Sequence, residues 1–149
     1  MDIPSIEKIR ENILKIDDPF QRQLTIETLN QFGISLISPN EAYTGASVKG
    51  FYLEKKYYRA ESFIDILREI IGIMVRHHGQ DIDKILTIKG PKRKYFSKDK
   101  NDIHTEEKIR GTNIYFEKND NAKTLAMRCE KILKLFGHDY VSFKIEIYR

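Results

Sequence analysis

The segment from Ser62 to about His78 constrains the fold more than any other part of the chain. Eight of its side chains are those of Phe, Ile, Leu or Met, and they fall on more than one face of a helix. Such a helix must be covered on several sides, so we expect it to be the central buried helix, ending at Gly79. Gly72 inside it costs about 1 kcal/mol relative to alanine, which predicts close packing against another element.

Shorter patterns after this helix predict an α+β fold. Residues 50–60 contain two aromatic runs around Glu54 and Lys55, which favours a two-strand hairpin or a bent strand. Helices mixed with short strands that suit antiparallel pairing predict a small antiparallel sheet packed with helices. The remaining expected elements are a short helix at 81–86, strands at 92–96, 114–116 and 143–148, and a helix at 122–136.

The helix at 122–136 is amphipathic. Its spacing places Leu125, Cys129 and Leu133 on a buried face and Arg128 in solvent. Cys129 is therefore expected to be a core residue. It is the single cysteine of the chain, which excludes an internal disulfide framework.

The first part of the chain predicts an N-terminal helical hairpin that precedes the sheet. Isoleucines recur at helical spacing after Pro4 and Ser5, and Asp18-Pro19 is typical of a second helix start, with Gly33 at its end. Residues 34–50 mix Ser, Pro, Asn and Gly, which favours a connecting loop. The organisation we expect is a hairpin at 1–33, for packing on the core or for oligomerisation, and an α+β domain at 40–149.

The positive charge of the chain is concentrated in residues 89–100. These twelve residues net +5, whereas the whole chain of 149 residues nets +4. Local charge of this kind is typical of a surface that binds phosphates, although a solvated loop is the alternative. We expect Lys89, Lys92 and Lys94 to contact a DNA backbone. Arg93 alternates with its neighbours along the expected strand, so we expect it to face a base.

Asn119 and Asn121 are the second candidate feature. An asparagine amide matches the donor and acceptor edge of adenine in the major groove. Asn121 is also a typical N-cap, and Asn-Asp-Asn is common turn chemistry. In either case a helix N-terminus beside a basic loop favours an anion such as phosphate. We expect Asn119 and Asn121 to contact bases and Lys123 to contact the backbone.

The sequence contains no recognisable catalytic constellation. His77 and His78 are adjacent and cannot both face one site, and His104 and His138 lack liganding spacing, so surface histidines are expected. No nucleophile is paired with a base, and no glycine loop is suited to cradle phosphate. We therefore expect a non-enzymatic protein with no catalytic residues, no metal and no cofactor.

A small metal-dependent nuclease is the lowest-ranked alternative. Glu54 with Lys56, and Asp81 with Asp83 and Lys84, are faintly similar to the sites of acid and lysine residues in such enzymes. Short charged combinations of this kind arise often by chance in a chain that is 32% charged.

The stretch from about Phe63 to Phe136 resembles the C-terminal DNA-binding domain of SeqA, the bacterial negative modulator of replication initiation. The similarity rests on order and spacing: a long apolar helix, an aromatic strand before the last helix, and the short motifs Gly90, Arg93, Tyr95-Phe96, Gly111-Thr112, and Asn119 with Asn121. A block made of Tyr43-Thr44-Gly45, Tyr95-Phe96, Gly111-Thr112 and Asn121 is also similar to a module of uncharacterised prokaryotic proteins, which implies a domain start near residue 40 and a distant relationship to SeqA.

The resemblance implies an α+β domain that binds hemimethylated GATC in the major groove through two loops. By position, Asn119 and Asn121 would contact the methylated adenine pair, and Arg93 would take the place of the second arginine of the basic loop. The chain departs from SeqA at three of these positions: Pro91 replaces the first arginine, Lys92 an intervening threonine, and Asp120 the threonine between the asparagines.

These observations together predict a regulator that binds double-stranded DNA with site preference, through loops 89–94 and 119–121, and that is sensitive to adenine or its methylation. The N-terminus has no apolar leader and no run is long enough to span a bilayer, so we expect a soluble, cytoplasmic, nucleoid-associated protein without membrane contact. The alternative is an accessory subunit without DNA binding of its own, whose hairpin docks a protein partner or a second copy.

Overall fold

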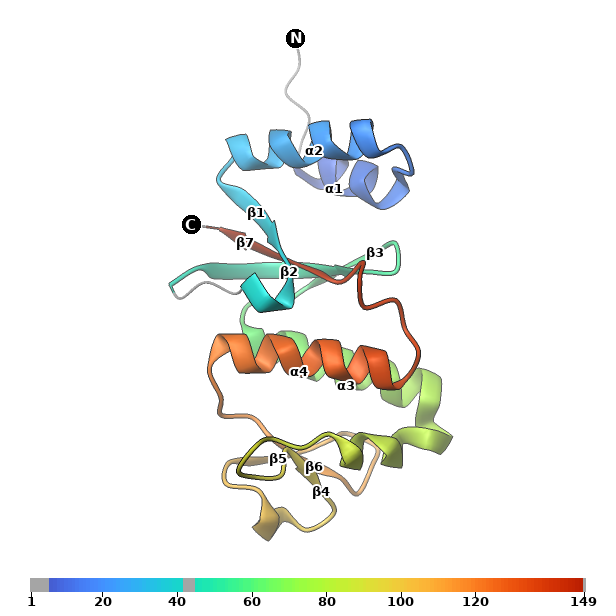
Figure 1. The fold of residues 1–149 in the computed structure, drawn as a ribbon, viewed down its shortest axis with the longest axis vertical. Coiled ribbons are helices and arrows are strands. Elements are labelled where there is room, and N and C mark those ends of the chain that lie inside the picture. Colours follow the sequence, from blue (N-terminus) through green and yellow to red (C-terminus); the bar gives the residue numbers. More distant parts are fainter. Residues whose placement is uncertain (1–5, 42–44, 149) are drawn as a thin grey trace.

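The computed structural model describes residues 6–41 and 45–148, and these are arranged in four layers (Figure 1). A helical hairpin covers one face of a four-stranded sheet, two long helices cover the other face, and a small three-stranded sheet lies beyond these helices. The α+β fold with an N-terminal hairpin is thereby confirmed. The expected helix start at Pro4-Ser5 and the Tyr43-Thr44 pair lie outside the described residues.

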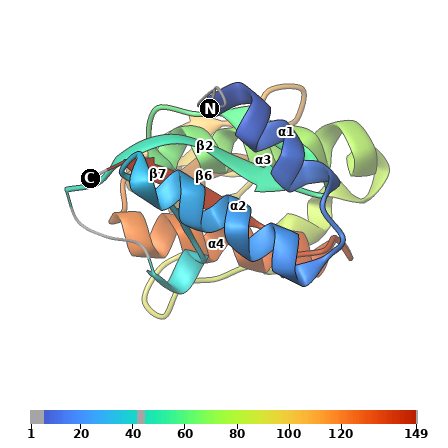
Figure 2. The same ribbon diagram turned by 90° about the horizontal axis from the view of Figure 1, so that it is seen from above.

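The hairpin consists of α1 (Ile6–Lys15) and α2 (Pro19–Gln31). Asp18 caps α2 as predicted, because its carboxylate accepts a hydrogen bond of 2.8 Å from the Phe20 backbone N–H. Gly33 follows α2 at a φ of +77°. Seen from above, the two helices lie side by side across the sheet (Figure 2). The hairpin therefore packs on the sheet, where Ile9 and Leu29 form with Ile34 a hydrophobic cluster separate from the main core.

The four-stranded sheet has the order β1-β7-β2-β3 and is antiparallel throughout. Its strands are β1 (Ile34–Ile37), β2 (Ser47–Leu53), β3 (Lys56–Arg59) and β7 (Lys144–Tyr148). The expectation of a loop over 34–50 was wrong, because β1 and the start of β2 lie in that range, with a 3₁₀ turn (η1, Pro39–Glu41) between them. β1 pairs with β7, more than a hundred residues away, and local composition carries no sign of this pairing.

The two-strand hairpin around Glu54 and Lys55 is confirmed. Both residues have positive φ, +47° and +64°, which is the backbone of a tight two-residue turn between β2 and β3. Gly50 on β2 is required by sterics, since a Cβ there would lie 2.3 Å from the Tyr58 backbone oxygen.

The central helix is α3 (Phe63–His78), capped by Ser62 and packed against α4 (Ala122–Leu135). Its buried core position is confirmed. The prediction of close packing at Gly72 was wrong: within 4 Å, a Cβ there would meet one side chain, that of Arg76 on the same helix, at 3.4 Å. Beyond α3 the chain continues as a 3₁₀ helix, η2 (Gly79–Thr87), where a short α-helix had been expected.

Cys129 is fully buried on α4, as expected, whereas the expectation for Arg128 was wrong. The Arg128 side chain is 1% exposed and points under the loop that precedes α4. Its charge is matched there by Asp120 and by a backbone carbonyl, which makes its burial possible.

The small sheet has the order β4-β6-β5, with β4 (Phe96–Ser97), β5 (Glu106–Lys108) and β6 (Tyr115–Glu117); a 3₁₀ turn, η3 (Lys100–Asp102), follows β4. The strand expected at 92–96 was wrong: the ladder with β6 begins at Phe96, the Tyr95 carbonyl accepts from the Glu117 backbone N–H over 2.9 Å, and residues 91–93 form bends. Residues 89–94 instead form a loop closed by a bridge between Lys89 and Lys94. No helix among the described residues has the length and apolarity to span a membrane.

Candidate nucleic-acid interface

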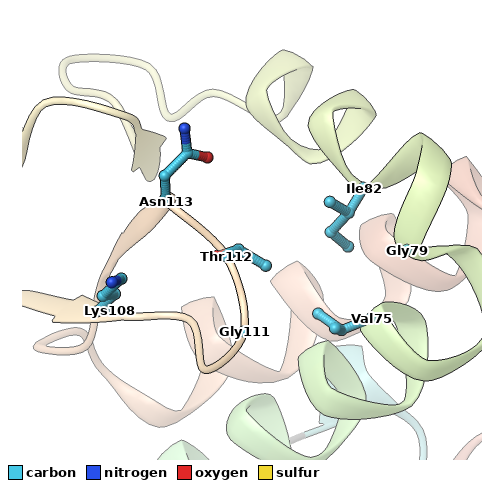
Figure 3. A pocket seen from close by; sticks show the side chains of 7 residues that line it. All are labelled: Val75, Gly79, Ile82, Lys108, Gly111, Thr112 and Asn113. Carbon is cyan, nitrogen blue, oxygen red and sulfur yellow. The ribbon is translucent and has the colours of Figure 1, made fainter.

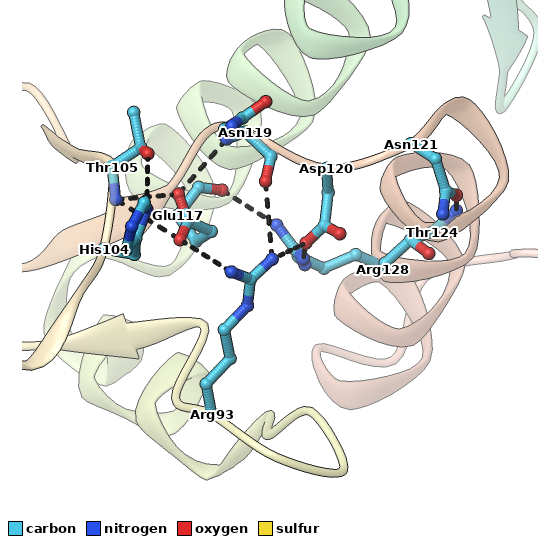
Figure 4. A network of polar contacts seen from close by, with 9 residues as sticks. All are labelled: Arg93, His104, Thr105, Glu117, Asn119, Asp120, Asn121, Thr124 and Arg128. Carbon is cyan, nitrogen blue, oxygen red and sulfur yellow. Dashed lines mark hydrogen bonds and ion pairs between the residues drawn. The ribbon is translucent and has the colours of Figure 1, made fainter.

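The two predicted loops, the basic loop 89–94 and the asparagine loop 119–121, lie against each other (Figure 4). Arg93 joins them: its guanidinium donates to the Asn119 carbonyl over 3.4 Å and lies 3.3 Å from the Asp120 carboxylate. It also lies 3.5 Å from the carboxylate of Glu117 at the end of β6. Segments twenty-six residues apart in sequence thus form one surface.

Both asparagines are exposed on this surface. The Asn121 side-chain oxygen accepts a 2.8 Å hydrogen bond from the Thr124 backbone N–H, so Asn121 is the N-cap of α4. Its NH₂ group makes no hydrogen bond within 6–41 or 45–148. The Asn119 amide likewise contacts none of these residues by a hydrogen bond, although its backbone N–H donates to Glu117 over 3.2 Å. Both asparagines therefore present donors to solvent from a fixed backbone.

Two buried charged side chains, those of Glu117 and Arg128, hold the asparagine loop in place. Glu117 is fully buried, and its carboxylate accepts from the backbone N–H groups of Thr105 (3.0 Å) and Asn119. Arg128 donates to the Glu117 carbonyl over 2.9 Å and to Asp120 over 2.6 Å. Its guanidinium lies 3.6 Å from the centroid of the Tyr95 ring, a stacking contact with the end of the basic segment.

Sequence reasoning missed Glu117 and Arg128, and one signal could have found the arginine. Arg128 lies three residues after Leu125 and four before Ile132, which is the spacing of the buried face of α4. Because arginine is charged, we instead expected Arg128 to lie in solvent. Nothing in the local pattern marks Glu117 as buried, because its partners come from Thr105 and Arg93.

We expected Arg93 to face a base, but its position in the structure differs from this prediction. The strand on which its alternation depended does not form, and its guanidinium, 44% exposed, faces two carboxylates. In this arrangement Arg93 positions the asparagine loop. Asp120 is correspondingly turned inward between Arg93 and Arg128, with 14% of its side chain exposed, so two cations neutralise its negative charge.

The four lysines expected at the DNA backbone, Lys89, Lys92, Lys94 and Lys123, are all exposed. Lys94 forms an ion pair with Asp102 over 3.2 Å. The other three form no ion pair with any residue of the described ranges. Exposed lysines without a counter-charge are well suited to exchange bound counterions for phosphates. Pro91 is also exposed, in the bend of the basic loop.

A cavity of about 450 Å³ lies apart from these loops, between the end of α3 and the β5–β6 turn (Figure 3). Val75, Ile82 and Lys108 contribute side chains to it, and Gly111 to Asn113 form its turn. Gly111 has a φ of +82°, and the Thr112 hydroxyl donates to the Ile109 carbonyl, so this pair shapes the turn. With Lys108 as the single ionisable lining residue, the cavity offers no acid and base pair for catalysis.

The histidines do not all lie on the open surface as expected. His78 and His138 are half-buried, and their Nε2 atoms are 2.7 Å apart. The Nδ1 atom of His138 lies 2.9 Å from the Glu54 carboxylate. Burial, together with the neighbouring histidines, lowers the pKa of His78. Among the described residues, no group of three or more His, Cys, Asp or Glu side chains is arranged to hold a metal ion.

No known protein family, curated protein or solved structure matches the chain. The resemblance to SeqA therefore stays a prediction, and the function rests on the site itself.

Proposed function

We propose that this chain is a non-enzymatic protein that binds double-stranded DNA with site preference, and that it associates with the nucleoid. One observation carries the proposal: Asn119 and Asn121 are exposed on a loop whose backbone is fixed by buried partners and which adjoins the basic loop. Fixed amides give the orientation that base-edge recognition needs, and the adjacent lysines give affinity for phosphates.

Each group has a distinct role in this proposal. Asn119 and Asn121 contact base edges in the major groove, with adenine as the matching base, which makes the contact sensitive to adenine methylation. Lys89, Lys92, Lys94 and Lys123 contact the backbone. Arg93 joins the two loops, and a direct base contact by Arg93 would require it to leave Glu117 and Asp120.

Substitution of the asparagines tests this assignment. Asn119→Ala is expected to cost about 1 to 3 kcal/mol at a DNA site selected from random duplexes and little on unselected DNA. Asn121→Ser removes the amide but keeps an N-cap oxygen, so it separates base contact from helix capping. Asn113→Ala, at an exposed asparagine of the β5–β6 turn, is the matched control. Equal losses on selected and random DNA would refute base recognition.

A protein partner is the alternative, and one observation favours it. Three large apolar side chains of the N-terminal hairpin region are exposed: Phe20 (68%) and Leu24 (43%) on α2, and Phe32 (41%) directly after it. Successive members of this set are one or more helical turns apart. They lie on the layer farthest from the two loops (Figure 1), so both activities could coexist. If the alternative alone holds, Phe20→Ser will disrupt an assembly seen by light scattering, and the wild-type chain will show no DNA binding at low salt.

A further inference from the structure

A second cavity, of about 450 Å³, lies where the chain enters the basic loop beside the C-terminal half of α4. Three lysines line it: Lys89 from the basic loop, and Lys131 and Lys134 from α4. The other lining residues are Thr87, Ile88 and Leu135, so no carboxylate is among the six. Three lysine residues thus line one hollow in the surface.

The positive charge of this cavity is not compensated. None of its lysines forms an ion pair with a residue in 6–41 or 45–148, and all three are exposed. The Lys134 ammonium lies 4.6 Å from the centroid of the Tyr140 ring, which restricts its position without neutralising it. Like charges brought together in this way repel one another, and an anion between them relieves the repulsion.

The helix dipole explains only part of this arrangement. Lys134 lies in the last turn of α4, where a cation stabilises the helix C-terminus. Lys89 belongs to a different segment, and helix stability gives no reason to bring it to the same cavity. An anion site requires cations from different segments around one hollow, and here the basic loop and α4 both contribute lysines.

The position of the cavity relates it to the proposed DNA interface. Arg93 of the basic loop reaches Asp120, which precedes the N-terminus of α4, and Lys89 of the same loop lines the cavity beside the C-terminal half of the helix. The 14 residues of α4 span about 20 Å, or about six base pairs of duplex, at 1.5 Å per residue and 3.4 Å per base pair.

We propose that Lys89, Lys131 and Lys134 form a phosphate-binding site that contacts the backbone of the same duplex, about six base pairs from the bases that Asn119 and Asn121 contact. The ligand chemistry is a phosphate group, supplied by a DNA backbone or by a free phosphate. The DNA form of this inference rests on the function proposed above.

The test measures DNA affinity against salt for Lys131→Gln and Lys134→Gln, on a long duplex and on one truncated to end beside the asparagine loop. On the long duplex, each variant is expected to reduce the slope of log affinity against log salt by about one unit. On the truncated duplex, variants and wild type should coincide. Lys15→Gln, at an exposed lysine of the N-terminal hairpin, is the control and should leave the slope unchanged.

A titration with inorganic phosphate, followed by NMR at the amides of residues 131–135, tests the site independently of DNA. If wild type binds DNA and the variant slopes are unchanged, the duplex is excluded as the ligand; a phosphate response that both variants abolish would then identify free phosphate. If the salt slopes of the variants are unchanged and no phosphate response is seen, the proposed site is refuted. A loss of stability in the variants would not support the site, because stabilisation of the C-terminus of α4 by these lysines would by itself explain that loss. If wild type binds no DNA, the proposed function itself fails.

Discussion

Substitution of Arg10 tests how firmly the N-terminal hairpin is joined to the sheet. Arg10 on α1 donates through Nε, over 3.0 Å, and through a second nitrogen to the carboxylate of Glu146 on β7, which is fully buried. Tyr52 and Tyr57 donate to the same carboxylate over 3.2 and 3.3 Å. Burial and the carboxylate raise the pKa of both hydroxyls, so they remain donors at neutral pH. Arg10→Leu leaves the carboxylate in place without a counter-charge.

The cost of this change follows from the charge that it leaves behind. Removing one partner of a buried ion pair costs about 3 to 5 kcal/mol, because the remaining charge stays buried without its partner. Loss of the Arg10 contact with the Tyr57 ring adds about 0.5 to 1 kcal/mol. The hydrogen bonds from Tyr52 and Tyr57 remain and offset part of this cost. We therefore expect Arg10→Leu to lower the free energy of unfolding by about 4 kcal/mol at neutral pH.

Urea denaturation of wild type and variant measures this difference. Arg10→Leu combined with Glu146→Gln should recover part of the lost stability, because the double variant no longer buries a charge without a counter-charge. Arg22→Leu, at an exposed arginine of the same hairpin, should cost about 0.5 kcal/mol or less. A deficit below about 1 kcal/mol for Arg10→Leu would contradict this expectation.

Three further predictions concern single positions. Gly72→Ala should raise the free energy of unfolding by up to about 1 kcal/mol, whereas Gly50→Ala should lower it by more than about 2 kcal/mol because its Cβ would meet the Tyr58 carbonyl; denaturation curves that shift in the same direction would contradict this. Burial raises the pKa of the Cys129 thiol to about 12, so an aromatic disulfide reagent should react with it only after urea unfolding, and rapid reaction of the folded chain would contradict its burial. Asn121→Ala should cost about 1 kcal/mol of stability through loss of the α4 cap, while Asn121→Ser should cost little; equal thermal shifts would contradict the capping role.

Local signals in the sequence predicted the helices and their ends well. The caps Asp18 and Asn121 were recognised, and Ser62 was placed at the start of its helix, because each bonds to a backbone N–H within three residues. The turn at Glu54-Lys55 is equally local. What the sequence hides is pairing over distance, and β1 was missed because its partner β7 lies at the other end of the chain.

In the candidate site, too, features that depend on local pattern were predictable and features that depend on distant contacts were not. Exposure of Asn119 and Asn121 and the capping by Asn121 followed from local pattern. The partners of Arg93 could not, because Glu117 and Asp120 reach it only through the tertiary fold. A charged residue whose counter-charge is distant in sequence is indistinguishable from a solvated one until the fold is known.

The proposed function requires that the loops 89–94 and 119–121 bind double-stranded DNA. Fluorescence anisotropy of the full chain with a pool of random duplexes, titrated over a range of salt, measures this binding. We predict binding at low salt whose log affinity falls linearly with log salt, with a slope of about −3.6 for the four backbone lysines and about −5.4 if Lys131 and Lys134 also contact phosphates. Absence of binding at low salt, or an affinity that does not change with salt, would contradict it.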